Sequence, residues 1–326
     1  MPSKSGFVQE LERLPLPMQV SNRGYPPIQL FVQFMAGVWC GANRFFHLDV
    51  SRFDRNIQKI FGWDRMPEHK AFQRYFEKFD MASNYNVFGG LYRCFFDNLK
   101  FDNFTLDIDF SVITRYGEQQ GAKKGYNKHK PGRKSQHPII AFVSDVEMVA
   151  NFWLRSGDAH TANNFKAFLE ETLSFFGNKK IGLLRLDSGF YDQSIFDYLE
   201  QEEVRIDYIT AVPMYVTIQR KIALENRIKE LKYDYGLDKM NQDGFDGTEA
   251  CLLLMTIAYN FMSLFKQFVI NEKVRNRLST LRYKMLAIPA YIEEHSNKTI
   301  VKMALQMNRR AWIRKLWDKS AAFQFY

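Results

Sequence analysis

The chain has 326 residues, of which 46% are hydrophobic and 16% aromatic, with 30 Phe among them. This apolar content is enough for a sizeable core and excludes a chain that is disordered over long stretches. The formal net charge is +9, and residues 251–326 carry an equal excess, with 13 Lys and Arg against four Asp and Glu. Such a basic region favours a polyanionic partner.

Cys40, Cys94 and Cys251 lie far apart, so they form neither a metal-ligand motif nor a disulfide framework, and we expect a reducing compartment. The longest apolar stretch, CLLLMTIAYNFMSLF (251–265), is shorter than the roughly 20 residues that span a bilayer, and we expect a buried helix there. No signal-peptide pattern opens the sequence. We therefore expect a soluble protein of the cytoplasm with no membrane partner.

The first hundred residues have a helical pattern. Residues 1–25 are polar and contain Pro, and we expect them to be loosely ordered. Beyond them apolar residues recur every three or four positions, and Ser51 and Pro67 stand where helix starts are expected. The predicted helices cover residues 28–39, 51–63, 68–79 and 86–99.

Beyond residue 100 strands and helices alternate. Short alternating or apolar runs predict five strands, at 104–113, 138–144, 147–155, 181–187 and 205–213. Amphipathic runs predict helices at 158–176, 191–203 and 225–236, the last ended by Gly236. We expect the rest of the chain to be helical.

The order of three strands, helix, strand, helix, strand, helix is typical of the ribonuclease H-like fold. We therefore predict an α/β protein with a mixed sheet and flanking helices, plus helical regions at both ends. The predicted divisions are a helical N-terminal region at 1–100, the ribonuclease H-like core at 101–236, and a basic helical C-terminal region at 237–326.

Three acidic residues occupy special places in this order. Asp109 lies in the first strand, Asp187 ends the fourth, and Glu225 opens the helix after the fifth. The first and fourth strands are neighbours in a sheet of this topology, so the carboxylates are expected to converge. Two Mg²⁺ ions about 4 Å apart, held by such carboxylates, support phosphodiester cleavage. Clustered carboxylates repel one another without a metal.

Each of these residues also has a plainer interpretation. Asp187, before Ser-Gly, fits an ordinary turn or helix cap, and Glu225 fits a first helical turn. Asp107, on the same strand face as Asp109, is interpreted as an edge or solvent-facing carboxylate rather than a ligand. Asp158 or Thr161 is expected to cap the helix near His160 and Asn163.

A second basic cluster lies between the first two predicted strands, where residues 115–137 hold seven Lys and Arg and one Glu. A solvated hairpin loop is the plain interpretation, but the position beside Asp109 favours contact with phosphates, and Tyr126 is placed to stack on an unpaired base. The candidate DNA-binding residues in this cluster are Lys123, Lys124, Tyr126, Lys128, Lys130, Arg133 and Lys134. The basic C-terminal helices fit either a solvated face or a DNA clamp.

Four segments together resemble a known family: LDIDFSV, GYNKHKPGRKSQHP, RLDSGFYDQSIFDYLE and ENRIKELKYDYG. They are similar to DDE transposases of the IS1380 type, within the IS4 superfamily, from about residue 106 to 236. The similarity is weaker in the flanks, at GFDGTEA and MNRRAWIRKLWD.

The resemblance implies metal-dependent cleavage at insertion-sequence ends and strand transfer into target DNA, in a bacterial, nucleoid-associated protein. Asp109, Asp187 and Glu225 fall on the catalytic and metal-binding positions, with Mg²⁺ as the ion and Mn²⁺ as a substitute. Lys232 falls on the signature Lys, two helical turns after Glu225, and would hold a phosphate. The implied partner is double-stranded DNA, bound at its ends by the N-terminal region and synapsed by a homo-oligomer.

The sequence departs from this family in two ways. Relatives insert a largely β domain before the Glu-bearing helix, whereas only residues 214–224 stand there in this chain. The Tyr and Arg of the signature are replaced by Ile218 and Lys221. Two alternatives therefore stay open: a catalytically impaired deletion derivative that binds DNA and inhibits an intact transposase, and a general ribonuclease H-like nuclease.

Overall fold

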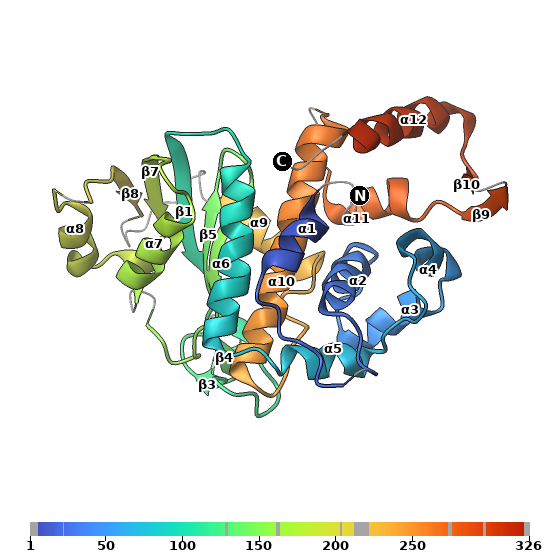
Figure 1. Ribbon diagram of the computed structural model, residues 1–326. Helices are drawn as coiled ribbons and strands as arrows, with labels where there is room; N and C mark the ends of the chain where they lie inside the picture. Colours follow the sequence, from blue (N-terminus) through green and yellow to red (C-terminus); the bar gives the residue numbers. More distant parts are fainter. Residues whose placement is uncertain are drawn as a thin grey trace.

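The computed structural model describes residues 6–21, 23–127, 130–160, 164–202, 204–211, 222–272, 276–295 and 298–322, without the side chains of residues 222–226, 294, 295 and 298. A mixed sheet with its covering helices forms one side of the molecule, and a helical region with a small β-hairpin forms the other (Figure 1). The long helices α6 (Met81–Asp97) and α10 (Phe245–Leu264) lie between the two sides.

The central sheet has five strands in the order β6-β5-β1-β7-β8. The strands are β1 (Phe104–Phe110), β5 (Ile139–Val143), β6 (Met148–Trp153), β7 (Ile181–Leu186) and β8 (Tyr208–Thr210). The pairs β1–β5 and β5–β6 are antiparallel, whereas β1–β7 and β7–β8 are parallel. This arrangement confirms the ribonuclease H-like fold, with the first and fourth predicted strands side by side.

Three helices follow strands of this sheet. They are α7 (Phe165–Ser174), α8 (Gln193–Leu199) and α9 (Ile222–Tyr233). The helix predicted at 158–176 begins only at Phe165, and its first residue follows Asn164 in a left-handed conformation with no side-chain cap. Capping by Asp158 was therefore wrong, because that carboxylate bonds to Lys123 instead. Thr161 and Asn163 lie outside the described residues.

The N-terminal helices follow the predicted order, with two corrections. They are α1 (Phe7–Arg13), α2 (Pro27–Trp39), α3 (Leu48–Arg52), α4 (Arg55–Phe61) and α5 (His69–Phe76). Residues 7–13 are helical rather than loose, because Phe7 and Leu11 are buried in the core. The helix predicted at 51–63 is divided, and Asp54 rather than Ser51 caps α4 by accepting from two backbone N–H groups.

The C-terminal region was predicted to be helical to its end, but it also contains two strands. After α10, a π-helical turn (Phe265–Ile270), α11 (Leu278–Leu281) and a second π-helical turn (Arg282–Leu286), the chain forms an antiparallel hairpin of β9 (Ala290–His295) and β10 (Lys298–Met303). The β-branched run Thr299, Ile300, Val301 favours the strand. Helix α12 (Met307–Ala322) ends the described chain.

One hydrophobic cluster joins the helices to the sheet. It includes Phe34 of α2, Phe88 of α6, Phe142 of β5 and Leu254 of α10, all at most 1% exposed. The prediction of a buried helix at residues 251–265 is confirmed. Helix α10 with its π-helical extension is long and apolar enough to cross a membrane, but 72% of its most apolar window is buried within the protein.

Polar side chains of α10 satisfy the outer edge of strand β6, which is the last strand on this side of the sheet in the described part of the chain. Asn260 accepts from the Val149 N–H at 2.8 Å and donates to the Val149 carbonyl at 2.9 Å. Glu249 accepts from the Leu154 N–H at 2.8 Å. The helix therefore takes the place of a sixth strand and closes this edge of the sheet.

Asn260→Ala is expected to lower the free energy of unfolding by about 2–4 kcal/mol, because it leaves a buried N–H and a buried carbonyl of Val149 unsatisfied. Denaturant unfolding measures this loss. Asn98→Ala is the control, since Asn98 is exposed and bonds only within its own helix end, to Cys94. Equal losses in the two variants would contradict the edge-closing role of Asn260.

Stability is expected to fall with rising pH through Glu249. Burial raises the pKa of Glu249 to about 7, so the folded protein keeps a proton that the unfolded chain loses above its ordinary pKa of 4.5. As the pH rises from 4.5 to about 7, the free energy of unfolding therefore falls. Glu249→Gln lacks this effect, so its stability relative to wild type should improve by about 2–3 kcal/mol between pH 5 and pH 8. Unfolding at both pH values tests this, and a constant difference would contradict it.

Candidate active-site cleft

Asp109 and Asp187 stand next to each other at the ends of two parallel strands. Ile108 of β1 pairs in register with Leu186 of β7, and each carboxylate residue follows one of these. Neighbouring strands lie about 4.8 Å apart, so the two Asp backbones are close. Both residues are partly exposed and line the same cleft.

The two carboxylates also share a face of the sheet. Two positions earlier, Asp107 and Arg185 are register partners whose side chains form an ion pair. Side chains two positions apart on a strand point to the same face. Asp109 and Asp187 therefore project from the face on which Asp107 and Arg185 meet.

The cleft has a volume of about 1810 Å³ and lies between several regions of the chain. The N-terminal region contributes Arg44, Phe46, His69 and Gln73, and the segment after α9 contributes Asp238, Lys239 and Asn241. The remaining lining comes from the ends of β1 and β7, the segment after β1, α9, and His137, Ala159 and His160. The contribution of the N-terminal region to the cleft was not predicted from the sequence.

Helix α9 carries Glu225 and Lys232. The side chain of Glu225 lies outside the described part of the chain, but its position is in the first turn of the helix. Ile228, Lys229 and Lys232, which follow it by three, four and seven residues, line the cleft. These spacings place position 225 on the same helix stripe.

Lys232 is tied to the end of the β1 region. Its Nζ donates to the Val112 carbonyl at 3.0 Å. Burial lowers the pKa of Lys232, against the attraction of Asp238 and Asp109. The ammonium group thus lies at the floor of the cleft near Asp109.

The plain interpretation of Asp187 as a turn former is correct, together with its place in the cleft. Its Oδ1 accepts from the Ser188 N–H at 2.7 Å and caps the short 3₁₀ turn Ser188–Phe190. Asp192, not Asp187, caps α8. In the same way Oδ1 of Asp109 accepts from the Phe110 N–H at 2.7 Å. These backbone bonds fix the direction of one oxygen of each carboxylate.

Asp107 is buried, so its interpretation as an edge or solvent-facing carboxylate was wrong. Strand β1 is the centre of the sheet, and the Asp107 side chain is only 1% exposed. Arg185 donates from Nε to Oδ1 of Asp107, and from Nη2 to Oδ2 of Asp107 at a distance of 2.5 Å. These bonds raise the pKa of Arg185. Ser144 also donates to Oδ2, and Nη1 of Arg227 lies 3.6 Å from it.

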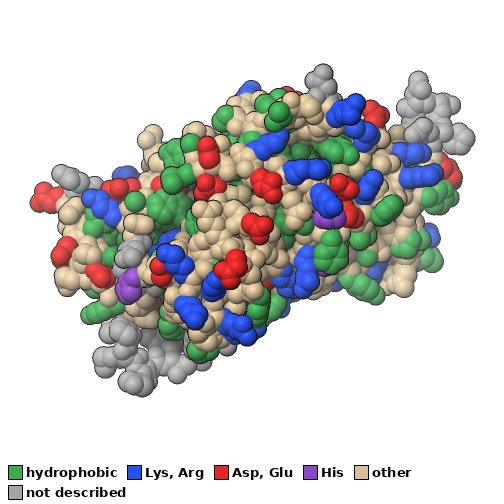
Figure 2. Space-filling model, turned by 90° about the horizontal axis from the view of Figure 1, so that it is seen from below, with side chains coloured by type: hydrophobic (Ala, Val, Ile, Leu, Met, Phe, Trp, Pro, Cys, Tyr) green, Lys and Arg blue, Asp and Glu red, His purple; other side chains and the backbone are tan. Residues whose placement is uncertain are grey.

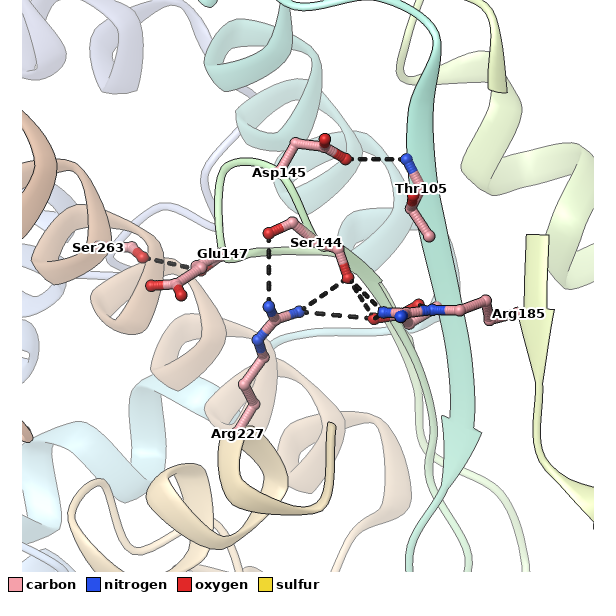
Figure 3. Close-up of polar contacts among 8 residues, drawn as sticks. Thr105, Ser144, Asp145, Glu147, Arg185, Arg227 and Ser263 are labelled. Carbon is pink, nitrogen blue, oxygen red and sulfur yellow. Dashed lines mark hydrogen bonds and ion pairs between the residues drawn. The ribbon is translucent and has the colours of Figure 1, made fainter. Parts of the chain in front are cut away.

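Arg185 and Arg227 approach Ser144 from two different elements, β7 and α9 (Figure 3). This group was not predicted from the sequence. The signal was the Arg within the apolar run LLRLD, because an Arg in a buried strand needs a counter-charge on the neighbouring strand.

The basic cluster after β1 is partly strand rather than a simple solvated loop. A small sheet, in the order β2-β4-β3, is formed by β2 (Ile113–Thr114), β3 (Lys123–Lys124) and β4 (Lys134–Gln136). A Cβ on Gly125 would lie 1.8 Å from the Gly157 carbonyl oxygen, so the backbones cross here at a distance that only glycine allows.

The predicted DNA-binding residues of this cluster have different surroundings. Tyr126 is 63% exposed and lines the cleft, as does Lys130. Lys123 pairs with Asp158 at 2.9 Å, and Lys134 pairs with Glu118 at 2.5 Å. Lys130 and Arg133 lie over the ring of Tyr116, and Lys124 is exposed on β3. Lys128 lies outside the described residues.

Two further polar groups that line the cleft have shifted pKa values. Burial lowers the pKa of Arg115 to about 10, although its Nε donates to Gln136 at 2.9 Å. Burial also lowers the pKa of His137. Figure 2 shows the molecule from below the view of Figure 1. On this face, Lys and Arg are interspersed with exposed hydrophobic side chains along the lower edge and in the right-hand half. The lining of the cleft around the acidic pair likewise combines cations with apolar and aromatic side chains.

The donor set suits a hard cation. Asp109 and Asp187 offer carboxylate oxygens at one edge of the sheet, and α9 offers a third acidic position at Glu225. Among the residues with described side chains, no three His, Cys, Asp or Glu are placed to hold a metal ion. Glu225 is outside that set, so the described pair amounts to two of the three predicted ligands.

Comparison with known proteins gives the family. A family model described as "Transposase DDE domain group 1" matches residues 3–224 and 215–322. No curated protein matches. The structure titled "Cryo-EM structure of piggyBac transposase synaptic complex with hairpin DNA" aligns with 86% of this chain and 75% of that one, at 11% identity and a TM-score of 0.45. Because the family match takes in nearly the whole sequence, the chain belongs to the group 1 family of DDE transposase domains.

Proposed function

We propose that the chain cleaves DNA at the ends of an insertion sequence and joins the freed 3′-OH to target DNA. The catalytic and metal-binding residues of this proposal are Asp109, Asp187 and Glu225. One observation carries it: the register of β1 and β7 brings Asp109 and Asp187 together on one face, in a cleft that α9 borders.

DDE transposases generally use divalent metal ions. Mg²⁺, or Mn²⁺ in its place, would be held by the three carboxylates and would activate the attacking oxygen and stabilise the leaving one. The chain's own contribution is to aim the donors. The backbone bonds of Asp109 and Asp187 orient their carboxylates, and Lys232 supplies a cation for a phosphate beside them.

The partner of this proposal is double-stranded DNA, held by a homo-oligomer that brings two ends together. Contributions to the cleft from Arg44, Phe46 and His69 support a DNA-contacting role for the N-terminal region at 1–100. Lys239, which also lines the cleft, supports a similar role for the basic region at 237–326. Tyr126 and Lys130 would contact DNA from the segment between β3 and β4.

We further propose that the chain is of the IS1380 type and lacks the usual insertion. The family match is divided into two parts that overlap at residues 215–224. This is the stretch between the fifth strand and the Glu-bearing helix, where relatives carry their extra domain. The division of the match supports a deletion at this point.

Asp187→Asn or Asp109→Asn is expected to reduce cleavage of terminal-repeat DNA by at least about a thousandfold in Mg²⁺, because each removes a charged metal ligand from the reacting centre. A labelled duplex and a denaturing gel measure the nick. Asp197→Asn is the matched control, since Asp197 is exposed on α8 and bonds only to Gln193.

Cleavage that needs no metal ion, or full activity in Asp187→Asn, would overturn the proposed site. Salt-dependent DNA binding without cleavage in the wild type would identify the chain as a binding-only deletion derivative. Cleavage of any duplex without regard to its ends would identify a general nuclease.

Tyr126→Ala should weaken binding of DNA with an unpaired end by roughly fivefold to a hundredfold, because one base–aromatic stack is lost. Tyr126→Phe should bind as wild type, since its ring keeps the stacking surface. Fluorescence anisotropy measures both. Tyr85→Ala is the control, because Tyr85 is 45% exposed on α6 and does not line the cleft. Equal weakening by Tyr126→Ala and Tyr126→Phe would point to the hydroxyl instead.

A further inference from the structure

A charged group lies beneath the proposed site, and its members keep a constant spacing from the catalytic residues. Asp107 precedes Asp109 by two residues, Arg185 precedes Asp187 by two, and Arg227 follows Glu225 by two. We infer that Asp107, Arg185, Arg227 and Ser144 are positioning residues, which set the separation of the three carboxylates. This inference rests on the proposed function for its catalytic meaning.

The link between the two strands is the strongest part of this group. Arg185 forms a two-pronged ion pair with Asp107, one prong of which measures 2.5 Å. Paired forks of this kind add geometric definition as well as energy. Because a strand advances about 3.3 Å per residue, the pair lies only about 7 Å below Asp109 and Asp187. Any slip of β7 along β1 would break it.

Ser144 extends the link to α9. It lies just after β5, and its backbone N–H donates to the Thr105 carbonyl at 2.9 Å, which fixes it to β1. Its Oγ contacts Nη2 of Arg185 at 2.7 Å and Nη1 of Arg227 at 3.3 Å. Nη2 of Arg227 also donates to the Ser144 carbonyl at 3.4 Å. Figure 3 shows both guanidinium groups turned toward Ser144.

Arg227 therefore holds the first half of α9 against the sheet. Its side chain is 14% exposed and lies 3.6 Å from the fully buried carboxylate of Asp107. Two residues of helix correspond to about 3 Å along the axis, so the backbone of Glu225 is about 3 Å along the helix from that of Arg227, the anchor of α9. Small displacements of a catalytic group reduce rates strongly. The anchor thus acts on Glu225 through the helix.

Charge makes two explanations distinguishable. Arg227 places a positive charge beneath the proposed metal ligands. If Arg227 acted only through its charge, its neutral replacement would strengthen cation binding. If it positions α9, the same replacement weakens cation binding. Loss of outer contacts of this kind typically costs 10–100-fold in metal affinity.

The test compares full-length Arg227→Met and Arg227→Lys with wild type by calorimetric titration with Mn²⁺ alone. Arg227→Met is expected to bind Mn²⁺ at least about tenfold more weakly. Arg227→Lys should recover part of the loss, because an ammonium still reaches Ser144. Amide exchange without metal should be faster in the first turns of α9 in Arg227→Met. Arg93→Met on α6 is the control, since Arg93 packs over Phe175 and does not line the cleft.

Unchanged or tighter Mn²⁺ binding by folded Arg227→Met would overturn the positioning role. Should that variant fail to fold, Ser144→Ala decides, since it keeps the Arg185–Asp107 pair and removes only the hydroxyl. It should weaken Mn²⁺ binding severalfold, and wild-type binding would overturn the inference. Failure of the proposed function looks different, because Asp109→Asn would then bind Mn²⁺ as the wild type does.

Discussion

The buried carboxylate of Asp107 is the constraint around which the site is built. A carboxylate at 1% exposure in the central strand is tolerable only with charged partners and satisfied lone pairs. These partners come from a neighbouring strand, a turn and a helix that are distant in sequence: Arg185, Ser144 and Arg227. Because all three contact the Asp107 carboxylate, they fix the positions of β7 and α9 relative to β1. Removing Arg185 would take away the two-pronged partner of a buried carboxylate, so the arrangement is hard to change in parts.

At the β6 edge of the sheet, buried polar groups are again satisfied by side chains from a distant element. Strand β6 is an edge, and its outer N–H and carbonyl groups need partners that no strand provides. Asn260 and Glu249 supply them from within an otherwise apolar helix. Helix α10 also packs on α2 and α6, so the N-terminal helices are held to the sheet through it. This explains how Arg44 and His69, far from the sheet in sequence, come to border the cleft.

Prediction from sequence succeeded where the pattern is local and repeated. The alternating strands, the order of strands and helices, and the neighbouring ends at Asp109 and Asp187 follow from period and topology alone. The β9–β10 hairpin was missed because it lies within a basic region whose flanks are helical, and α1 was missed because its burial depends on distant partners. Asp107 was misjudged because a single strand does not reveal whether it is central or at an edge. The surroundings of Glu225 depend on a connection whose contacts no local pattern specifies.

The contacts of α9 bear on the proposed loss of the insertion. The first half of the helix is tied to the sheet by Arg227, and its last turn by Lys232, which donates to the Val112 carbonyl. Between these two residues, Glu230 accepts from Lys266 at 2.8 Å, and just past the helix Arg282 donates to the Asp234 carbonyl at 2.9 Å. A helix that the core holds from Arg227 to its end needs no preceding domain to set its position. On the proposed assignment, the missing insertion would therefore remove DNA contacts, while the core itself keeps the spacing of the carboxylates.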